Sequence, residues 1–192
     1  GFGRGREGNV DTLRALGRER GFLVDVISPV SVLDGGSAGP ASSTLLRRAV
    51  AGGDLETAAR ELGRRYSVTG TVRPGDSRGR LLGFPTINLG SPHPGKLLPP
   101  EGVYGDLVHT PLGPSGGMMN LGTRPTFGDT TVTLEAHLLD ADVELYGATV
   151  KMEFVARLRD VRRFPSPDAL VAQLRPDESH ARRALTRVAA GH

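Results

Sequence analysis

The stretch Thr131-Val-Thr-Leu-Glu-Ala-His-Leu-Leu139 alternates between apolar and polar residues. Successive side chains of an extended chain point to opposite faces, so one face collects the apolar residues Val132, Leu134, Ala136 and Leu138. Glu135 is the sole carboxylate of the stretch and shares the other face with His137. This period of two predicts a strand that buries one face, as in an antiparallel sheet or barrel.

The same period recurs in three further runs, 66–72, 102–109 and 148–158, separated by turns that carry Gly and Pro. In the last run the predicted buried face consists of Val150, Met152, Phe154, Ala156 and Leu158. A helix is predicted to follow, with Ser166 as its N-cap and Pro167 at its first position. We expect Pro176 to break or restart this helix.

Residues before the first strand have an α/β pattern instead. Helices are predicted over 10–20, after Ser42-Ser43-Thr44, and from the N-cap Asp54 to Gly63. A short apolar strand is predicted over 22–27, and a loop over 34–41. The change of period places a domain boundary between residues 64 and 65.

The glycine-rich stretch from Gly70 to Asn88 carries the most chemical information. Glycines at 75, 79 and 83 allow the backbone to approach a ligand, and Arg78 and Arg80 suit a phosphate. The stretch contains neither a Walker A motif nor GxGxxG. Taken alone, it also fits an ordinary hairpin with a glycine-rich turn.

Thr86 and Asn88 end this stretch and are two residues apart, so an extended backbone puts them on one face. A hydroxyl and an amide oxygen are neutral hard ligands. They suit Mg²⁺, which takes most of its charge neutralisation from substrate phosphates.

The whole stretch resembles the GxVxxGxxxGRxLGxPTAN signature of riboflavin kinases, with Ile87 in place of the usual alanine. Further motifs follow in that family's order: 101–104 is similar to its PxGVY strand, 120–127 to its NxGxRPTF loop and 134–138 to its VExHLL strand. Matches also occur at 145–147, 158–159, 164–174 and Asp177. The resemblance covers about residues 66–188.

The resemblance implies a mainly β fold, a six-stranded antiparallel Greek-key barrel with a C-terminal helix, over residues 65–190. It implies an enzyme that transfers the ATP γ-phosphoryl group to the 5′-hydroxyl of riboflavin, giving FMN and ADP. Glu135 would be the base, Thr86 and Asn88 the Mg²⁺ ligands, and Gly75, Gly79, Arg80 and Gly83 the phosphate-covering loop. Asn120, Arg124 and Thr126 would border the flavin.

Residues 1–64 resemble part of the FMN adenylyltransferase half of bacterial bifunctional FAD synthetases, on the stretches 3–10 and 40–47. We expect them to be an incomplete, Rossmann-like α/β nucleotidyltransferase remnant, and the chain to be a piece of a longer protein. The HxGH motif of that class of enzyme does not occur in the sequence. We therefore expect FMN adenylylation only from the full-length parent protein.

Composition excludes several other functions. The 192 residues contain no cysteine, so disulfides and Cys-ligated metal sites are excluded, and a reducing cytoplasm is the expected location. Net charge is only +3 and aromatics are 5%, which disfavours nucleic-acid binding. No apolar run reaches the roughly 18 residues of a membrane helix, and no obligate protein partner is predicted. Two alternatives stay open: a non-catalytic or redox FMN-binding barrel, and a small nucleic-acid-binding barrel.

Overall fold

The computed structural model describes residues 2–28, 30–34, 37–75, 78–90, 92–93, 95–125 and 130–190. The chain forms two compact units, Gly1–Ala41 and Ser42–His192. Among the described residues, no helix combines the length and apolar character that crossing a bilayer requires.

The first unit consists of a 3-10 turn η1 (Arg4–Arg6), helix α1 (Val10–Arg20) and an antiparallel hairpin of β1 (Ser31–Asp34) and β2 (Ser37–Pro40). The predicted helix over 10–20 is confirmed: the Asn9 side chain caps its first turn and Gly21 ends it in the left-handed conformation. The predicted strand over 22–27 is wrong, because this segment pairs with no other described segment. The predicted loop over 34–41 is also wrong, since β2 lies within it.

Two capped helices, α2 (Ser43–Gly52) and α3 (Leu55–Leu62), open the second unit. The Ser42 hydroxyl accepts from the Leu45 N–H, and the Asp54 carboxylate accepts from the Thr57 N–H, as the N-cap predictions require. Buried Ala49, Val50 and Ala58 form a small cluster against which Leu46 and Tyr66 pack. Tyr66 leads directly into the barrel, so α2 and α3 belong to the same compact unit as the barrel, which begins at Ser42.

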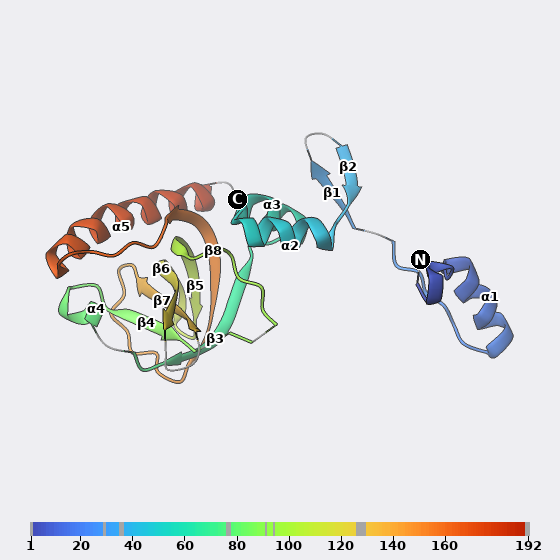
Figure 1. Ribbon diagram of the computed structural model, residues 1–192, viewed down its shortest axis with the longest axis horizontal. Helices are drawn as coiled ribbons and strands as arrows, with labels where there is room; N and C mark the ends of the chain where they lie inside the picture. The colour runs from blue at the N-terminus through green and yellow to red at the C-terminus, as the bar shows by residue number, and fades with distance from the viewer. Residues whose placement is uncertain are drawn as a thin grey trace. The chain divides into compact units, whose positions relative to one another are not determined.

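Six antiparallel strands then close into a barrel in the order β3-β4-β7-β6-β5-β8 (Figure 1). Their bounds are β3 (Ser67–Arg73), β4 (Thr86–Leu89), β5 (Gly102–Thr110), β6 (Gly113–Pro125), β7 (Thr130–Leu138) and β8 (Thr149–Arg159). Three hairpin-joined strands, β5, β6 and β7, are followed by β8, which returns to lie beside β5. This order is a Greek key, so the predicted barrel is confirmed.

The barrel interior holds the main hydrophobic core. Leu134, Ala136 and Leu138 of β7 are buried in it, as the alternation of 131–139 predicts. In β8 the prediction holds for Val150, Met152 and Phe154, but Leu158 packs against a second cluster instead. The cause is a shift in the pairing of β5 with β8 between Gly105 and Asp106 and again between Val103 and Tyr104.

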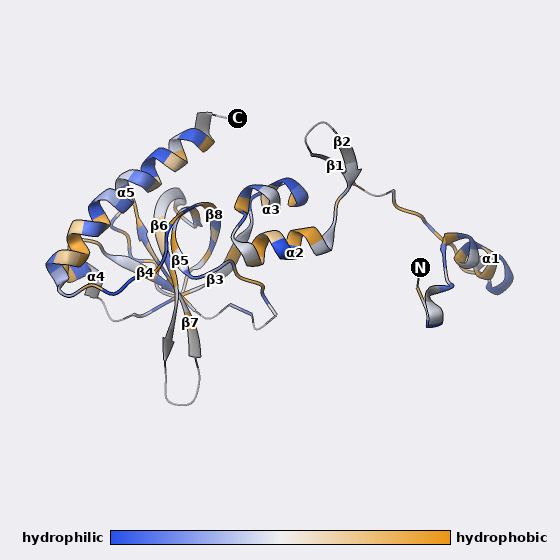
Figure 2. Cartoon of the chain, turned by 45° about the horizontal axis from the view of Figure 1, so that its top comes forward, coloured by the Kyte–Doolittle hydropathy of each residue, from blue (hydrophilic) through white to orange (hydrophobic). Residues whose placement is uncertain are grey.

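That second cluster lies where helix α5 (Pro167–Ala190) packs on the strands, with Val103, Met118, Leu139 and Ala181 buried. Figure 1 shows α5 running along the outside of the barrel, and Figure 2 shows that it carries both hydrophobic and hydrophilic residues. The Ser166 hydroxyl accepts from the Ala169 N–H, which confirms the predicted cap. The predicted break at Pro176 is wrong: the helix continues through it, because residues on both sides, Leu174 and Ala181, pack in the same cluster.

Candidate active site

Three neighbouring strands bring the predicted base and two amides into one row. Asn88 of β4 is the register partner of Glu135 of β7, and Glu135 is in turn the partner of Asn120 of β6. Register partners on adjacent strands point to the same face, with Cβ atoms about 4.5–5.5 Å apart. All three side chains are half-buried and point out of the barrel, since their neighbours Leu89, Leu134 and Leu121 are buried inside it.

The next row on the same face contains Thr86, His137 and Met118, which pair across the same strands. Thr86 and Asn88 thus share a face, as the sequence predicts, while Ile87 is buried in the core between them. Glu135 and Asn88 are far apart in the sequence, and the pairing of β4 with β7 brings them together.

A cavity of about 360 Å³ lies over these two rows. Its polar lining includes Thr86, Asn88, Asn120, Glu135 and His137. Its apolar lining comes from the strands, from the segment 161–174, and from α4 (Arg78–Leu81) with the residues just after it. The main apolar side chains are Leu82, Phe84, Val103, Met118, Val161, Phe164, Leu170 and Leu174. This lining suits a ligand with a broad apolar ring and a hydroxyl-bearing chain.

The glycine loop folds close to the site, and each predicted glycine has a definite steric role. A Cβ on Gly75 would overlap the Asn88 amide, and one on Gly79 would overlap the Phe84 carbonyl oxygen. Gly83 has φ of +80°, in the left-handed region that favours glycine. The loop also contains the short helix α4, which the sequence did not predict.

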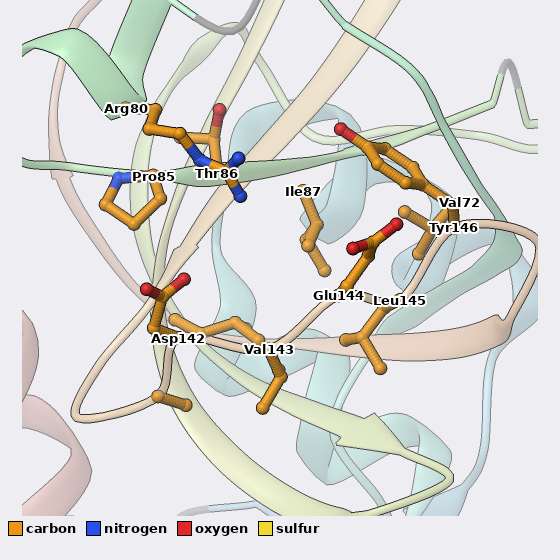
Figure 3. A pocket seen from close by; sticks show the side chains of 12 residues that line it. Val72, Arg80, Pro85, Thr86, Ile87, Asp142, Val143, Glu144, Leu145 and Tyr146 are labelled. Atoms are coloured by element: carbon orange, nitrogen blue, oxygen red, sulfur yellow. The ribbon is translucent and has the colours of Figure 1, made fainter.

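A second, smaller hollow of about 40 Å³ contains Arg80. Figure 3 shows Arg80 near Thr86, with the acidic side chains of Asp142 and Glu144 coming from the segment after β7. Arg80 therefore lines a different hollow from Glu135. Thr86 lines both, so the start of β4 is where the two hollows meet.

Two of the predicted flavin contacts are Arg124 and Thr126. Arg124 belongs to β6, where its backbone pairs with Thr131, so the predicted loop at 120–127 is a strand as far as Pro125. The Arg124 side chain and the whole of Thr126 lie outside the described residues. Asn120 lies on β6 and lines the cavity.

The sequence also missed one wall of the cavity, formed by two arginines and an aromatic ring. Arg159 and Arg162 both lie over the Phe164 ring, with guanidinium carbons 5.6 and 4.8 Å from its centroid. Arg159 is held by an ion pair to the buried Asp177 at 2.8 Å, and Gln173 donates to the other oxygen of that carboxylate. These positions match the family's motifs, but no spacing rule ties residue 159 to residue 177.

The donor set is consistent with Mg²⁺ bound together with substrate phosphates. Within the described part of the chain, no group of three or more His, Cys, Asp and Glu residues could hold a metal alone. Thr86 and Asn88, the predicted ligands, present a hydroxyl and an amide on one face, with Gly75 leaving space beside the Asn88 amide. A cation with so few protein ligands keeps waters and relies on phosphate oxygens, as Mg²⁺ does in kinases.

Comparison with known proteins gives concordant matches. Residues 62–185 match the family model described as "Flavokinase: Riboflavin kinase". The chain is 38% identical over 182 residues to the bifunctional riboflavin kinase/FMN adenylyltransferase of Escherichia coli K12, covering 94% of this chain and 56% of that protein. The protein of the same name from Bacillus subtilis is 37% identical over 143 residues, covering 73% and 45%.

Among solved structures, one from Streptococcus pneumoniae entitled as a macrolide-efflux protein superposes with a TM-score of 0.77. It is 31% identical, and the match covers 94% of this chain and 57% of that one. The chain thus spans a little over half the length of the first relatives it matches.

Proposed function

Because the chain belongs to the riboflavin kinase family, we propose that it transfers the γ-phosphoryl group of ATP to the 5′-hydroxyl of riboflavin. The observation that carries this proposal is the row of Asn88, Glu135 and Asn120 beneath a cavity with a large apolar wall. The Glu135 carboxylate and the proposed ligands Thr86 and Asn88 line the same cavity of about 360 Å³, which supports the proposal.

Glu135 is proposed to act on the attacking hydroxyl. Its carboxylate accepts the proton of the ribityl 5′-hydroxyl as that oxygen bonds to the γ-phosphorus and the bond from phosphorus to the ADP oxygen breaks. Phosphoryl transfer needs alignment and charge stabilisation more than covalent help, so a base adds about 10²–10⁴-fold in rate. The flanking amides of Asn88 and Asn120 restrict where the carboxylate and the substrate chain can lie.

The phosphate end is proposed to lie at the start of β4. Thr86 and Asn88 would hold Mg²⁺, which when bound neutralises charge on the phosphates. Gly75, Gly79 and Gly83 let the loop backbone cover the phosphates, and Arg80 supplies positive charge from the adjoining hollow.

The flavin is proposed to occupy the apolar side of the larger cavity. Phe164, Leu170 and Leu174 offer the surface for a fused aromatic ring, and Asn120 offers an amide to the polar chain. Arg124 and Thr126 remain proposed flavin neighbours on the strength of the family motif alone.

The domain assignment is also a proposal. Residues 65–190 are assigned to the kinase domain and 1–64 to part of an FMN adenylyltransferase domain. The family model starts at residue 62, whereas the Escherichia coli relative matches 182 residues and so extends well beyond that model. FAD formation is proposed only for a protein that contains the remainder of that domain.

The function is tested by incubating the chain with riboflavin, ATP and Mg²⁺ and following FMN by chromatography. We expect FMN to form with one ADP per FMN, and EDTA to abolish the reaction. A protein that purifies yellow with FMN yet phosphorylates no riboflavin would favour a flavin-binding barrel instead. Salt-dependent binding of DNA or RNA without kinase activity would favour a nucleic-acid-binding barrel.

A further inference from the structure

His137 contacts two consecutive residues that lead into β4, Pro85 through a ring nitrogen and Phe84 through its ring. Its Nδ1 lies 2.8 Å from the carbonyl oxygen of Pro85, a residue 52 positions earlier in the chain. A carbonyl oxygen can only accept, so this hydrogen bond requires the proton to be on Nδ1. The imidazole is half-buried on the cavity side of β7.

The carbonyl that His137 binds is immediately ahead of the proposed metal ligands. β4 begins at Thr86, whose register partner is His137 itself, and Pro85 lies just outside this ladder. The Pro85 carbonyl is therefore held to β7 by the His137 side chain and not by the backbone pairing of the sheet. This bond fixes where the backbone enters Thr86.

The same ring also contacts the apolar wall. The Phe84 ring meets His137 edge-on, with centroids 5.2 Å apart and planes at 66°. Phe84 lines the cavity and packs against the cluster beneath α5. One imidazole thus contacts the segment before the metal ligands through its nitrogen and the proposed flavin wall through its ring.

We propose that His137 is a positioning residue that sets Thr86 for the Mg-nucleotide through Pro85 and sets Phe84 for the flavin. This inference rests on the proposed function, because it assigns those two ends of the cavity to the two substrates. The two roles use different features of the side chain and can be separated by substitution.

Two matched variants separate the hydrogen bond to Pro85 from the ring contact with Phe84. His137→Asn places an amide N–H where Nδ1 was, and so keeps the bond to Pro85 while losing the ring. His137→Phe keeps a ring against Phe84 and loses the donor. Loss of a hydrogen bond that leaves its acceptor half-buried changes binding by about tenfold.

The readouts are the affinity for Mg-ADP by calorimetry, the affinity for riboflavin by fluorescence quenching, and the KM for each substrate. We expect His137→Phe to weaken Mg-ADP and raise the KM for ATP about tenfold, with riboflavin binding changed less than threefold. His137→Asn should show the reverse, weakened riboflavin binding with Mg-ADP affinity nearly unchanged.

The proposal is overturned if both variants weaken both ligands in parallel with a loss of melting temperature, since that is the result of a purely structural histidine. It is also overturned if neither variant changes either affinity by more than twofold. If the wild type binds both ligands but makes no FMN, the proposed function fails while the two affinities still decide the role of His137. Should His137→Phe not fold, His137→Tyr supplies a second variant that keeps a ring against Phe84 and has no donor at the Nδ1 position.

Discussion

Glu135 occupies the centre of the site because of its register and not because of any unusual local sequence. It is flanked by amides on both neighbouring strands, and the buried leucine before it fixes the face to which it points. A shift of β7 by one residue would turn Glu135 into the barrel core, so the same packing that stabilises the barrel also sets the position of the proposed base.

Gly75 provides a residue-level test of the loop. In Gly75→Ala the new methyl group would occupy the space of the Asn88 amide and force that side chain aside. We expect the KM for Mg-ATP to rise about tenfold or more with little change in riboflavin affinity, measured by steady-state kinetics and fluorescence. Gly63→Ala, at the left-handed C-cap of α3 and outside the lining of both hollows, is the control, because it should lower stability without changing KM.

Asp106 is a buried carboxyl that the proposed reaction does not use. It lies between Tyr104 and Val108 on the inward face of β5, fully buried, and neither oxygen has a hydrogen-bond partner among the described residues. Burial raises the pKa of Asp106 well above its ordinary value of 3.8. The folded state therefore favours the protonated acid.

Between 3.8 and the raised folded pKa of Asp106, the folded protein binds more protons than the unfolded chain, so stability falls as pH rises. In Asp106→Asn this fall should be smaller, as measured by urea unfolding from pH 4 upward. An unchanged slope in Asp106→Asn would contradict the assignment.

At the scale of elements, a buried ion pair and an exposed one, both among the described residues, join α5 to the barrel side of the unit. Asp177 and Arg159 have side chains 2% and 17% exposed, whereas Asp140, which pairs with Arg182, is 74% exposed. Removing one partner of a buried pair leaves an uncompensated charge, while an exposed pair contributes little.

Asp177→Ala is therefore expected to lower the free energy of unfolding by about 3–5 kcal/mol, with Asp140→Ala changing it far less. It should also weaken riboflavin binding, since Arg159 lines the cavity. Chemical denaturation and fluorescence titration measure the two effects. If the double variant Asp177→Ala/Arg159→Ala is not more stable than Asp177→Ala alone, the uncompensated charge of Arg159 does not cause the loss of stability.

The strands and helices that the sequence predicts correctly are those with a clean period or a cap, such as 131–139 and the helix after Ser42. The failures have physical causes that act over long distances. Pro176 is accommodated because α5 packs on the barrel along its length, and Leu158 leaves the core because of a bulge against β5. The segment 113–125 carries glycine and proline, so its strand is recognisable only through its pairing with β5 and β7.

The same limit applies to the site. The residue types at 86, 88 and 135 predict metal ligation and base chemistry, but only pairing of β4 with β7 shows that they are adjacent. The cavity wall from 161–174 depends on how α5 packs, which no local pattern specifies.

At the scale of the whole molecule, the division after Ala41 predicts which part suffices for activity. α2 and α3 pack with Tyr66 at the start of the barrel, so residues 42–192 should fold and phosphorylate riboflavin without residues 1–41. A chain starting at residue 65 should be less stable, because it loses the buried Val50 and Ala58. Melting temperature and FMN formation test both truncations, and equal stability of the two would contradict the division.

Glu135 carries the proposed chemistry, and the most direct measurement of its role is single-turnover FMN formation by the wild type and by Glu135→Gln at saturating Mg-ATP. Riboflavin binding is followed in the same samples. We predict that the variant binds riboflavin and keeps its melting temperature, while the transfer rate falls about 10²–10⁴-fold. A variant that binds riboflavin normally and forms FMN at close to the wild-type rate would contradict the proposed site.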